Sequence, residues 1–345
     1  MLELPAISTV CDLVPLIDES RMIVHFGLKV LRKTRSIGLK ALYVAGSIDQ
    51  STLDERTIGF QIGPRLNAPG RINHASPAME LLLTNDPIRA TELAAQIEQQ
   101  NRERQLLVGR VVTEAIDKIS TFGTNLPTVI ILADPGWPVG VLGLSASRLV
   151  ERYHRPVVLL NQMADGLIKG SARSIAGFNV LEAISAQRDL LQSFGGHHGA
   201  AGLSLDHAAL ADFERSLGEF AAARLTSELL TPTHRADATI SPIELTEKLL
   251  TECARFAPFG VANPTPRFVV EPLCVRSVRQ LGNDGQHLKL TFTNHPTSAL
   301  IWRFTERALS LPDVGQSIAI LGRAEWNSWQ GQRTIQLILD DWRSI

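Results

Sequence analysis

The chain has 345 residues, of which 44% are apolar, 20% charged and 6% aromatic, as expected for a soluble protein of about two or three domains. No apolar run approaches the roughly 20 residues that cross a bilayer, and the N-terminus lacks the basic start and cleavage site of a secretory signal, so a cytoplasmic protein is predicted. The formal net charge is −1 and the 3 cysteines are far apart, so nucleic-acid binding would need local basic clusters, and a disulfide framework or zinc site is disfavoured.

Residues 1–60 contain one candidate amphipathic helix, over residues 20–35. The residues expected on one side of this helix are Ile23, Phe26, Leu28, Val30 and Leu31. The next segment, residues 59–83, is rich in glycine and proline and is expected to be a loop that leads into a helix.

A long helix is predicted from Asp86 to about Ile119. Asp86 can cap its first turn, and Pro87 fits there because the first turn needs no N–H donor. At about 1.5 Å per residue, the helix would extend roughly 50 Å. Its centre, EQQNRERQ at residues 98–105, is too polar to be buried all round, so the helix is interpreted as a connector between domains.

Strand and helix signals alternate from residue 125 to about residue 226, which predicts an α/β domain. Strands are expected over residues 128–134, 155–161 and 166–175, the last as a strand or sheet edge. Helices are expected over residues 139–153, 179–194 and 206–225, with Asp206 as the cap of the last.

The period falls to two after a polar linker at residues 226–241 and a short helix at residues 243–256. Short strands are expected over residues 267–272, 274–281, 287–294, 298–304, 317–326 and 334–342. About five or six such strands in about 80 residues suit a small closed barrel, and the oligonucleotide-binding barrel is the commonest example that binds nucleic acid.

Two adjacent histidines, His197 and His198, lie within SFGGHHGAAGLSL, residues 193–205. A metal-binding pair needs partner ligands at defined spacing, and none is visible nearby. The glycines follow a predicted helix, which is the wrong order for a dinucleotide-binding turn. They can instead bring backbone N–H groups close to an anion, to which a histidine can also donate. A tight helix-to-strand turn with surface histidines is an equally good interpretation.

The segment KGSARS, residues 169–174, supplies donors suited to a phosphate. If this segment is extended, Lys169, Ser171 and Arg173 point to one face. Taken alone, a basic strand edge is more often only solvated.

The segment GPRLNAPGR, residues 63–71, carries Arg65, Asn67 and Arg71 on a turn stiffened by glycine and proline. Two arginines on such a turn can grip successive phosphates or stack on bases, and a structural turn with surface arginines is equally expected. The segment PFGVANPTPRF, residues 258–268, is interpreted as an ordered turn that docks a helix onto the barrel.

The predicted barrel offers aromatic and basic side chains to a nucleic acid. Its candidate stacking residues are Trp302, Phe304, Trp326 and Trp329, of which at least two are expected to fill the barrel core instead. Its candidate charged contacts are Arg276, Arg279, Lys289, Arg303 and Arg323.

The chain resembles the RecJ family of bacterial single-stranded-DNA-specific exonucleases, in the DHH phosphoesterase superfamily, over essentially its whole length. The resemblance is carried, in order, by STVCDLVPLIDESR, GPRLNAPGR, GWPVGVLGLSASRLVERYHRPVVLL, KGSARSI, SFGGHHGAAGLSL and PFGVANPTPRF. It implies an α/β fold with a C-terminal β-barrel. The implied parts are the remnant of a DHH domain (1–85), a long connecting helix (86–124), a DHH-associated domain (125–226), a linker with a short helix (227–265) and an OB-fold barrel (266–345).

Members of this family degrade single strands from the 5′ end in DNA repair and recombination, with two divalent metals, Mn²⁺ or Mg²⁺, that activate water. The metals are held by an Asp-x-Asp pair, a further aspartate, the Asp-His-His motif and a last aspartate. Only the last has a counterpart here, Asp12, and the others are expected before Met1. The pair His197 and His198 does not replace the motif, because Gly196 stands where an aspartate is needed.

One carboxylate cannot hold two metals about 4 Å apart. The chain is therefore expected to be the C-terminal portion of a RecJ, from a truncated gene, an internal start, a split gene or an expressed fragment. Such a chain would bind single-stranded DNA weakly and would not cut it alone.

The resemblance also implies which residues contact DNA. The 5′ phosphate and first nucleotides would meet Arg65, Asn67 and Arg71 on one side, and Ser171, Arg173, Gly196 and His197 on the other. Pro138 departs from the family, which commonly has histidine after the tryptophan of the GW segment.

Other functions stay open at this point. The chain could be a noncatalytic single-stranded-DNA-binding module, or half of a split enzyme whose partner is a DHH-domain chain. A DHH-family oligoribonuclease or cyclic-dinucleotide phosphodiesterase would share the glycine-histidine loop, but such proteins generally end before a barrel. Single-strand-binding protein is a further candidate partner, and no membrane partner is expected.

Overall fold

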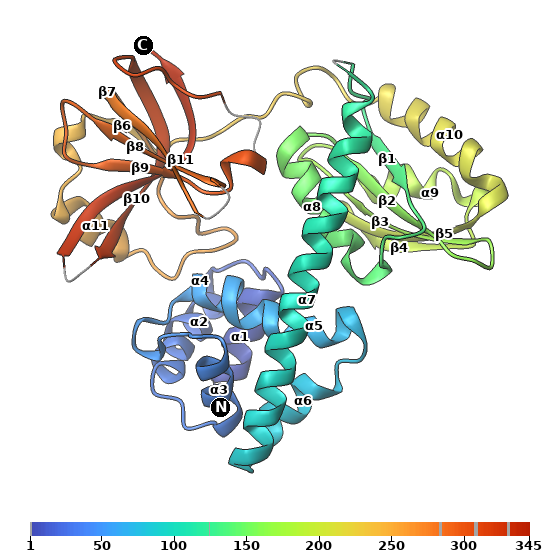
Figure 1. Cartoon of the computed structure of the whole chain (residues 1–345), viewed down its shortest axis with the longest axis horizontal. Coiled ribbons are helices and arrows are strands. Elements are labelled where there is room, and N and C mark those ends of the chain that lie inside the picture. The colour runs from blue at the N-terminus through green and yellow to red at the C-terminus, as the bar shows by residue number, and fades with distance from the viewer. Residues whose placement is uncertain (1, 124, 283–284, 307–309, 330–331) are drawn as a thin grey trace. The chain divides into compact units, whose positions relative to one another are not determined.

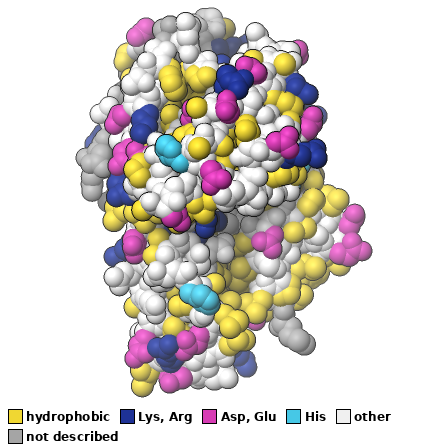
Figure 2. Space-filling view, turned by 90° about the vertical axis from the view of Figure 1, so that its right-hand side faces the viewer, with side chains coloured by type: hydrophobic (Ala, Val, Ile, Leu, Met, Phe, Trp, Pro, Cys, Tyr) yellow, Lys and Arg dark blue, Asp and Glu magenta, His cyan; other side chains and the backbone are white. Residues whose placement is uncertain are grey.

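A computed structural model describes residues 2–123, 125–282, 285–306, 310–329 and 332–345 (Figure 1). The chain forms two compact units: unit 1 comprises Met1–Thr34, Asp49–Gln61 and His234–Ile345, and unit 2 comprises Arg35–Ile48 and Ile62–Thr233. No helix within the described ranges is long and apolar enough to cross a membrane. On the face drawn in Figure 2, basic and acidic side chains are interspersed, in keeping with the net charge of −1.

The longest helix of unit 2 is α7 (Pro87–Ser120), which begins as predicted. The Asp86 carboxylate accepts hydrogen bonds from the N–H groups of Ile88 and Arg89, at 2.8 and 3.4 Å, and so satisfies donors that the first turn leaves open. One end of α7 packs against α3 (Ile37–Ala45), α5 (Gly63–Ile72) and α6 (Ser76–Leu83), and it also contacts α8 (Val139–Tyr153). The predicted connector thus joins a helical part to an α/β part within unit 2.

The segment at residues 63–71, predicted as a turn, is instead the helix α5. Pro64 lies in its first turn, where a missing N–H costs nothing, whereas Pro69 lies inside the helix. Ala68 and Pro69 are buried, and α5 packs along α7. Tertiary packing therefore overrides the local turn signals of glycine and proline.

A five-stranded sheet forms the α/β part of unit 2, in the order β1-β2-β3-β5-β4. Its strands are β1 (Ile130–Ala133), β2 (Val157–Gln162), β3 (Leu167–Arg173), β4 (Ser193–His197) and β5 (Ala200–Asp206). Only β1 and β2 pair in parallel among these neighbours; the other pairings are antiparallel. The alternating strands and helices predicted from residue 125 onward are thus present.

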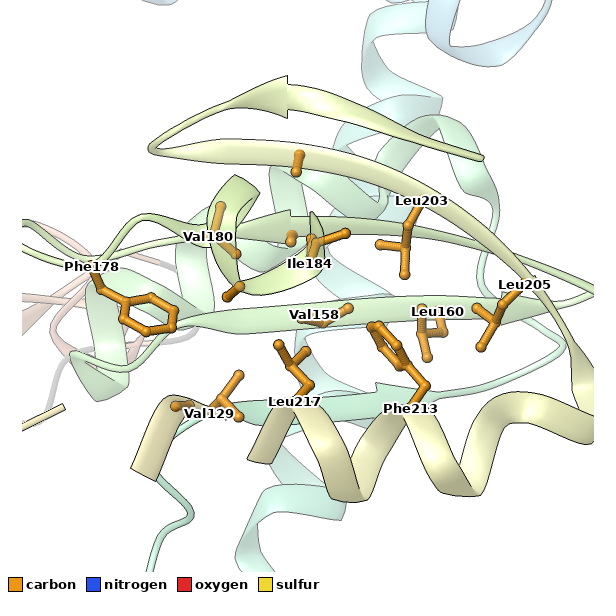
Figure 3. Packing of buried hydrophobic residues seen from close by; sticks show 14 of the residues in the cluster. Val129, Val158, Leu160, Phe178, Val180, Ile184, Leu203, Leu205, Phe213 and Leu217 are labelled. Atoms are coloured by element: carbon orange, nitrogen blue, oxygen red, sulfur yellow. The ribbon is translucent and has the colours of Figure 1, made fainter. Parts of the chain in front are cut away.

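One face of this sheet is covered by α9 (Val180–Ser185) and α10 (Leu210–Ala222). Figure 3 shows Phe213 and Leu217 of α10 pointing toward Val158 and Leu160 of β2, within one buried cluster. The alternate residues of β2, Val157 and Leu159, belong to a second buried cluster with residues of α7 and α8. Both faces of β2 are therefore buried over Val157–Leu160, which explains the apolar run of these four residues.

Two local predictions in this part were wrong. The helix predicted over residues 179–194 ends at Ser185 and is followed by a short 3-10 turn at Arg188–Leu190. Asp206 makes no capping hydrogen bond; its carboxylate accepts from Gln192 Nε2 at 2.7 Å. Since Asp206 ends β5 and α10 begins only at Leu210, the carboxylate is too early in the chain to cap that helix.

Unit 1 contains α1 (Glu3–Cys11), α2 (Asp18–Leu31), α4 (Glu55–Thr57) and α11 (Glu247–Ala254). The buried residues of α2 are Val24, Gly27, Leu28 and Leu31. Phe26, which was predicted on the buried side, is 46% exposed. The i, i+3, i+4 spacing of the buried set fits an amphipathic helix, so the helix was predicted correctly and its buried face only in part.

The strands of unit 1 close into a ring. They are β6 (Ala238–Ile240), β7 (Phe268–Leu281), β8 (His287–Phe292), β9 (Ser298–Ile301), β10 (Ser317–Trp329) and β11 (Gln332–Ser344). The sheet order is β10-β11-β9-β8-β7-β6, and β10 also pairs with β7, which completes the circuit. Its interior is apolar and includes Val270, Leu290, Ile320 and Leu337. β7 joins two strands that were predicted separately, and β6 was not predicted.

The segment at residues 258–268 is an ordered turn, as predicted. The Phe259 N–H donates to Glu55 Oε1 at 3.0 Å, and Asn263 Nδ2 donates to the carbonyls of Phe256 and Pro258. Leu16 N–H donates to the carbonyl of Val261 at 2.7 Å. The bonds to Glu55 and Leu16 fasten the turn to α4 and to the loop between α1 and α2, and the Asn263 bonds hold the turn itself, just before the chain enters β7.

Candidate phosphate-binding site

Lys169, Ser171 and Arg173 alternate along β3 on one face, as predicted. Ile168 and Ala172, which alternate with these residues along β3, belong to the buried cluster beneath α9 and α10. Arg173 Nη1 donates to Ser171 Oγ at 3.0 Å and to the carbonyl of Ala172 at 2.8 Å. The guanidinium is therefore held in place beside a hydroxyl group.

Gly143 of α8 lies directly against these two side chains. A Cβ at this position would lie 2.6 Å from Arg173 Nη2 and 3.0 Å from Ser171 Oγ. Any larger residue would have to push the guanidinium away. The glycine thus permits α8 to pack closely over the donor face of β3.

The predicted glycine-histidine loop is a β-hairpin made of β4 and β5. Gly196 pairs with Ala201 and has φ +149°, and a Cβ there would collide with the carbonyl of Ala200. His197 pairs with Ala200, which pairs with Arg173 on β3. Since directly paired residues share a sheet face, His197 and Arg173 lie on the same face at the same end of the sheet.

The exposed ring of His197 has one nitrogen engaged. Its Nδ1 accepts a hydrogen bond from the Gly199 N–H at 3.2 Å, so in the neutral ring the proton lies on Nε2, which is then a donor. His198 is a neighbour at 5.5 Å between ring centroids. No group of three or more His, Cys, Asp or Glu side chains able to hold a metal occurs among the described residues.

Arg71, at the end of α5, lies against the first turn of α8. Its Nη1 approaches the Gly140 carbonyl at 3.5 Å, and a Cβ on Gly140 would collide with the Arg71 carbonyl. Burial lowers the pKa of Arg173, and the positive charge of Arg71 lowers it further. Such a shift means that the two guanidinium groups lie close enough to repel each other. The structure therefore brings Arg71 to the donor face that carries Ser171 and Arg173.

Arg65 does not project with Asn67 and Arg71, as a turn would have allowed. In a helix, Asn67 and Arg71 are four residues apart and share a face, whereas Arg65 points away from Asn67. Arg65 Nε donates to Glu98 Oε2 at 2.7 Å, with both side chains only 13% exposed. Arg65 thus ties α5 to α7, and Asn67 is exposed.

Arg104 and Arg148, which the sequence analysis did not identify, belong with Arg71 to a cluster of arginines. Burial lowers the pKa of Arg104 on α7, and the charges of Arg71, Arg148 and Arg65 lower it further. The arginine cluster therefore consists of Arg65, Arg71, Arg104, Arg148 and Arg173, from α5, α7, α8 and β3.

A sequence signal for Arg104 does exist. Asn101 and Arg104 fall at the spacing that continues the apolar stripe from Ile97 to Val108, and both apolar ends of this run are buried. Asn101 is 1% exposed and its Oδ1 accepts from Arg104 Nη2 at 2.9 Å. Polar residues in a buried stripe are rarer than polar residues on a solvated helix face, so they more often indicate a specific role.

The charged residues predicted to contact DNA lie in different surroundings on the strands of unit 1. Arg279 and Lys289 pair directly across β7 and β8, so their charges share one face, and Arg276 is exposed on the same strand β7. Arg323 is half-buried, 3.9 Å from Asp340, and lines a cavity of about 490 Å³ with Glu55 and Arg56 of unit 1.

Arg303 is exposed, and its N–H donates to His287 Nδ1 at 2.9 Å. The adjacent Trp302 is 46% exposed and meets the His287 ring edge to face at 4.7 Å. Phe304 packs against the apolar interior of the strand ring. Trp326 lies under the Arg333 guanidinium, whose Cζ is 3.8 Å from the centroid of the Trp326 ring. The side chain of Trp329 lies outside the described residues. Of the aromatic side chains that are described, Phe304 fits the predicted core role and Trp302 is the exposed one.

Asp12, the predicted metal ligand, is exposed at the end of α1. The described residues do not place the further carboxylates or histidines of a metal centre around it. The described part of the chain therefore does not fit a complete two-metal site, and the role of Asp12 stays a prediction.

Comparisons with known proteins find similarity to RecJ proteins over nearly the whole chain. Residues 126–223 match the family model "DHHA1 domain" and residues 236–341 match "RecJ OB domain". The single-stranded-DNA-specific exonuclease RecJ of Bacillus subtilis is 40% identical over 99% of this chain and 44% of the relative, and that of Haemophilus influenzae is 33% identical over 99% and 61%. The chain thus spans about half the length of these curated relatives.

A solved structure shows the same arrangement of elements. The crystal structure of RecJ in complex with Mn²⁺ from Thermus thermophilus matches with a TM-score of 0.82 and 28% identity, over 100% of this chain and 49% of that one. The Mg²⁺ complex from the same organism matches with a TM-score of 0.82 and 29% identity, over 100% and 52%.

Proposed function

This chain belongs to the RecJ family of the DHH superfamily, and we propose that it is the part of a single-stranded-DNA-specific 5′–3′ exonuclease that holds the 5′ end of the strand. In this proposal the protein is cytoplasmic and acts in DNA repair and recombination. Its parts are a DHH-domain remnant (1–85), a connecting helix (86–124), a DHH-associated domain (125–226), a linker (227–265) and an OB-fold barrel (266–345).

The observation that carries the proposal is the convergence of Arg71, Ser171, Arg173 and His197 at one end of the sheet in unit 2. Two guanidinium groups beside a hydroxyl and a ring N–H match the oxygens of a phosphate. Desolvation lowers the pKa of both Arg71 and Arg173, so an anion would relieve an unfavourable charge. A terminal phosphate carries about −1.5 to −2 at pH 7, more than an internal phosphodiester, so it is the favoured occupant.

We assign binding, and not hydrolysis, to these residues. In the family, Mn²⁺ or Mg²⁺ supplies the activated water, but the described residues do not include a complete set of ligands for such a centre. The proposal is therefore that this chain binds single-stranded DNA and that cleavage needs the Asp-x-Asp and Asp-His-His carboxylates of a DHH domain.

The binding test compares 5′-phosphorylated and 5′-hydroxyl oligothymidine strands with the wild-type chain and with Arg173→Ala. Loss of a hydrogen bond to a charged group costs about 1.5–3 kcal/mol, which is roughly 10- to 100-fold in affinity. This loss is expected for the phosphorylated strand, with a smaller one for the hydroxyl strand. Equal losses for the two strands would remove the phosphate pocket.

The cleavage test incubates the chain with 5′-labelled single strands and Mn²⁺. Intact substrate is expected, and processive degradation by the purified chain would overturn the binding-only part of the proposal. One further candidate is half of a split enzyme whose partner is a DHH-domain chain. Cleavage that appears only after a DHH-domain chain is added would support that candidate over a noncatalytic module.

The match to the RecJ OB domain at residues 236–341 argues against an oligoribonuclease or cyclic-dinucleotide phosphodiesterase. The barrel residues Arg276, Arg279, Lys289 and Arg303 are proposed to continue the DNA contact, with Trp302 as a stacking platform. Single-strand-binding protein is proposed as a partner, which titration of the purified pair would test.

A further inference from the structure

A cavity of about 490 Å³ lies within unit 1 and shares no residue with the proposed phosphate site. Its wall is formed by α2, α4, α11, the turn at residues 258–268 and β10. A volume of this size is typical of pockets that hold a small organic molecule. Its apolar side chains include Leu28, Leu250, Phe259, Phe268 and Trp326. Three of these are aromatic, which favours a ligand with a flat apolar body.

Arg323 of β10 brings a guanidinium group to this cavity. Its side chain is 24% exposed, and its Nε is buried and makes no hydrogen bond within the described part of the chain. The ion pair with Asp340 is long, with Arg323 Nη1 at 3.9 Å from Asp340 Oδ1. Arg323 is therefore a partly desolvated cation that is not hydrogen-bonded to its nearest carboxylate.

The ion pairs around Arg323 leave one guanidinium group in excess. Asp340 Oδ2 lies closer to Arg267 Nε, at 3.2 Å, than Asp340 Oδ1 lies to Arg323. The other carboxylate on this part of the strand ring, Glu325, pairs with Arg56 at 2.9 Å. Three guanidinium groups thus share two carboxylates, and Arg323 has the longest of the three ion pairs.

The remaining charges on the wall have the same sign in excess. Lysine and arginine outnumber carboxyl groups there by five to three. The cations are Lys29, Arg32, Arg56, Arg255 and Arg323, and the carboxyl groups belong to Asp54, Glu55 and Glu325. Each of these carboxyl groups already accepts a hydrogen bond from the chain, Asp54 from Thr57, Glu55 from Phe259 and Glu325 from Arg56. The wall therefore favours an anion over a cation.

We propose that this cavity binds a small organic anion, with one carboxylate group on a flat apolar body. The carboxylate pairs with the Arg323 guanidinium, and the apolar body packs against Phe259 and Trp326. A single negative charge matches the single guanidinium in excess, and a mostly apolar wall matches an aromatic body better than a sugar-phosphate chain. This site does not depend on the proposed phosphate site of unit 2.

The test is a fluorescence titration with two dyes. Anilinonaphthalene sulfonate carries one negative charge, which stands in for the carboxylate, and phenylnaphthylamine has the same ring system without the charge. Wild type is expected to bind the sulfonate saturably, at one site, and more tightly than the neutral dye. Arg323→Gln should weaken the sulfonate by about 10- to 100-fold and the neutral dye by less than about threefold.

Three further variants control for position, charge and folding. Arg323→Lys keeps the charge and should retain more sulfonate affinity than Arg323→Gln. Trp326→Phe should reduce energy transfer from tryptophan to the bound dye while the affinity changes little. Arg343→Gln makes the same change of charge at a side chain that is 74% exposed on β11, and it should leave both affinities unchanged. Melting temperatures are compared throughout, because a loosened chain also binds such dyes.

The proposal fails if wild type binds the two dyes equally, or if Arg323→Gln weakens both to the same extent at an unchanged melting temperature. Single-stranded DNA is the competing occupant, because Arg323 was predicted to contact it. Oligothymidine should not displace the sulfonate dye, and Arg323→Gln should leave strand affinity unchanged. Displacement of the dye by oligothymidine would overturn the proposal and assign the cavity to the DNA-binding surface.

Discussion

Replacing Gly143 by alanine should weaken phosphate binding without unfolding the protein. The added Cβ would lie 2.6 Å from Arg173 Nη2, and ordinary contact begins at 3.4 Å, so the guanidinium must move by about 0.8 Å. Hydrogen bonds between nitrogen and oxygen tolerate only about 2.7–3.2 Å. A shift of this size therefore removes at least one charged hydrogen bond, and affinity for a 5′-phosphorylated strand should fall about 10- to 100-fold.

The free energy of unfolding of Gly143→Ala should rise slightly or stay nearly unchanged, even though binding weakens. Alanine in a helix interior is favoured over glycine by about 0.8–1.0 kcal/mol, and the colliding atoms belong to the far end of a flexible side chain and to a hydroxyl that can rotate. The gain is partly offset by the lost bond between Arg173 and Ser171, worth about 1 kcal/mol. The free energy of unfolding of unit 2 should thus stay within about 1 kcal/mol of wild type.

The assay pairs fluorescence anisotropy of labelled 5′-phosphorylated strands with thermal unfolding. Gly218→Ala on α10 is the matched control, because a Cβ there meets nothing within 4 Å; it should raise the melting temperature by about 2–4 °C and leave binding unchanged. If Gly143 acts through Arg173, Gly143→Ala adds no further loss in an Arg173→Ala background. An equal loss in both backgrounds, or no loss in wild type, would refute the reasoning.

Three further predictions concern stability. Arg65 is nearly buried, and Glu98→Gln removes the charge of its partner. This substitution should lower the free energy of unfolding by about 3 kcal/mol in urea titrations. Gly196→Ala forces a Cβ into the Ala200 carbonyl at φ +149° and should cost about 1–3 kcal/mol in thermal unfolding. Burial raises the pKa of Glu55 above its ordinary 4.5. The protonated carboxyl group therefore stabilises the fold at a pH below the pKa of the unfolded chain, and this stabilisation is lost as the pH rises through the pKa of the folded protein.

Each of these predictions has a comparison that can contradict it. Glu92 on the same helix pairs with Arg89 at the surface, so Glu92→Gln should change stability by less than about 1 kcal/mol. A Cβ on Gly195 meets nothing within 4 Å, so Gly195→Ala should be tolerated better than Gly196→Ala. Glu55→Gln should flatten the pH dependence of unit 1 unfolding above pH 4.5, and an unchanged slope would mean that burial does not govern this carboxyl group.

Features with a local cause were predicted well from the sequence. Asp86 and Pro87 set the start of α7 through the hydrogen bonds of a single turn, and the alternation along β3 follows from the period of an extended chain. The segment at residues 63–71 was predicted wrongly because its proline and glycine residues signal a turn locally, while packing of α5 on α7 decides the outcome. Local rules identify the motifs but not the surfaces onto which they pack.

The proposed phosphate site shows the same limit of local sequence rules. Arg71 and Arg173 were identified as candidates from their own segments, yet Arg104 and Arg148 join them only because α5, α7, α8 and β3 meet. No property of residues 98–105 alone distinguishes an arginine facing other arginines from one facing water. The buried stripe that contains Asn101 and Arg104 is the feature from which this placement could have been inferred.

Three glycines near the proposed site, Gly140, Gly143 and Gly196, each let one part of the chain approach another. The expectation that the glycines of residues 193–205 bring backbone N–H groups close to an anion stays a prediction. Gly140 admits the backbone of Arg71, Gly143 admits the side chain of Arg173, and Gly196 admits the facing strand of the hairpin. Since a side chain at any of them would displace a donor or the strand that carries one, these glycines fix the spacing of the donors, and in the proposed function that spacing would determine how a phosphate fits.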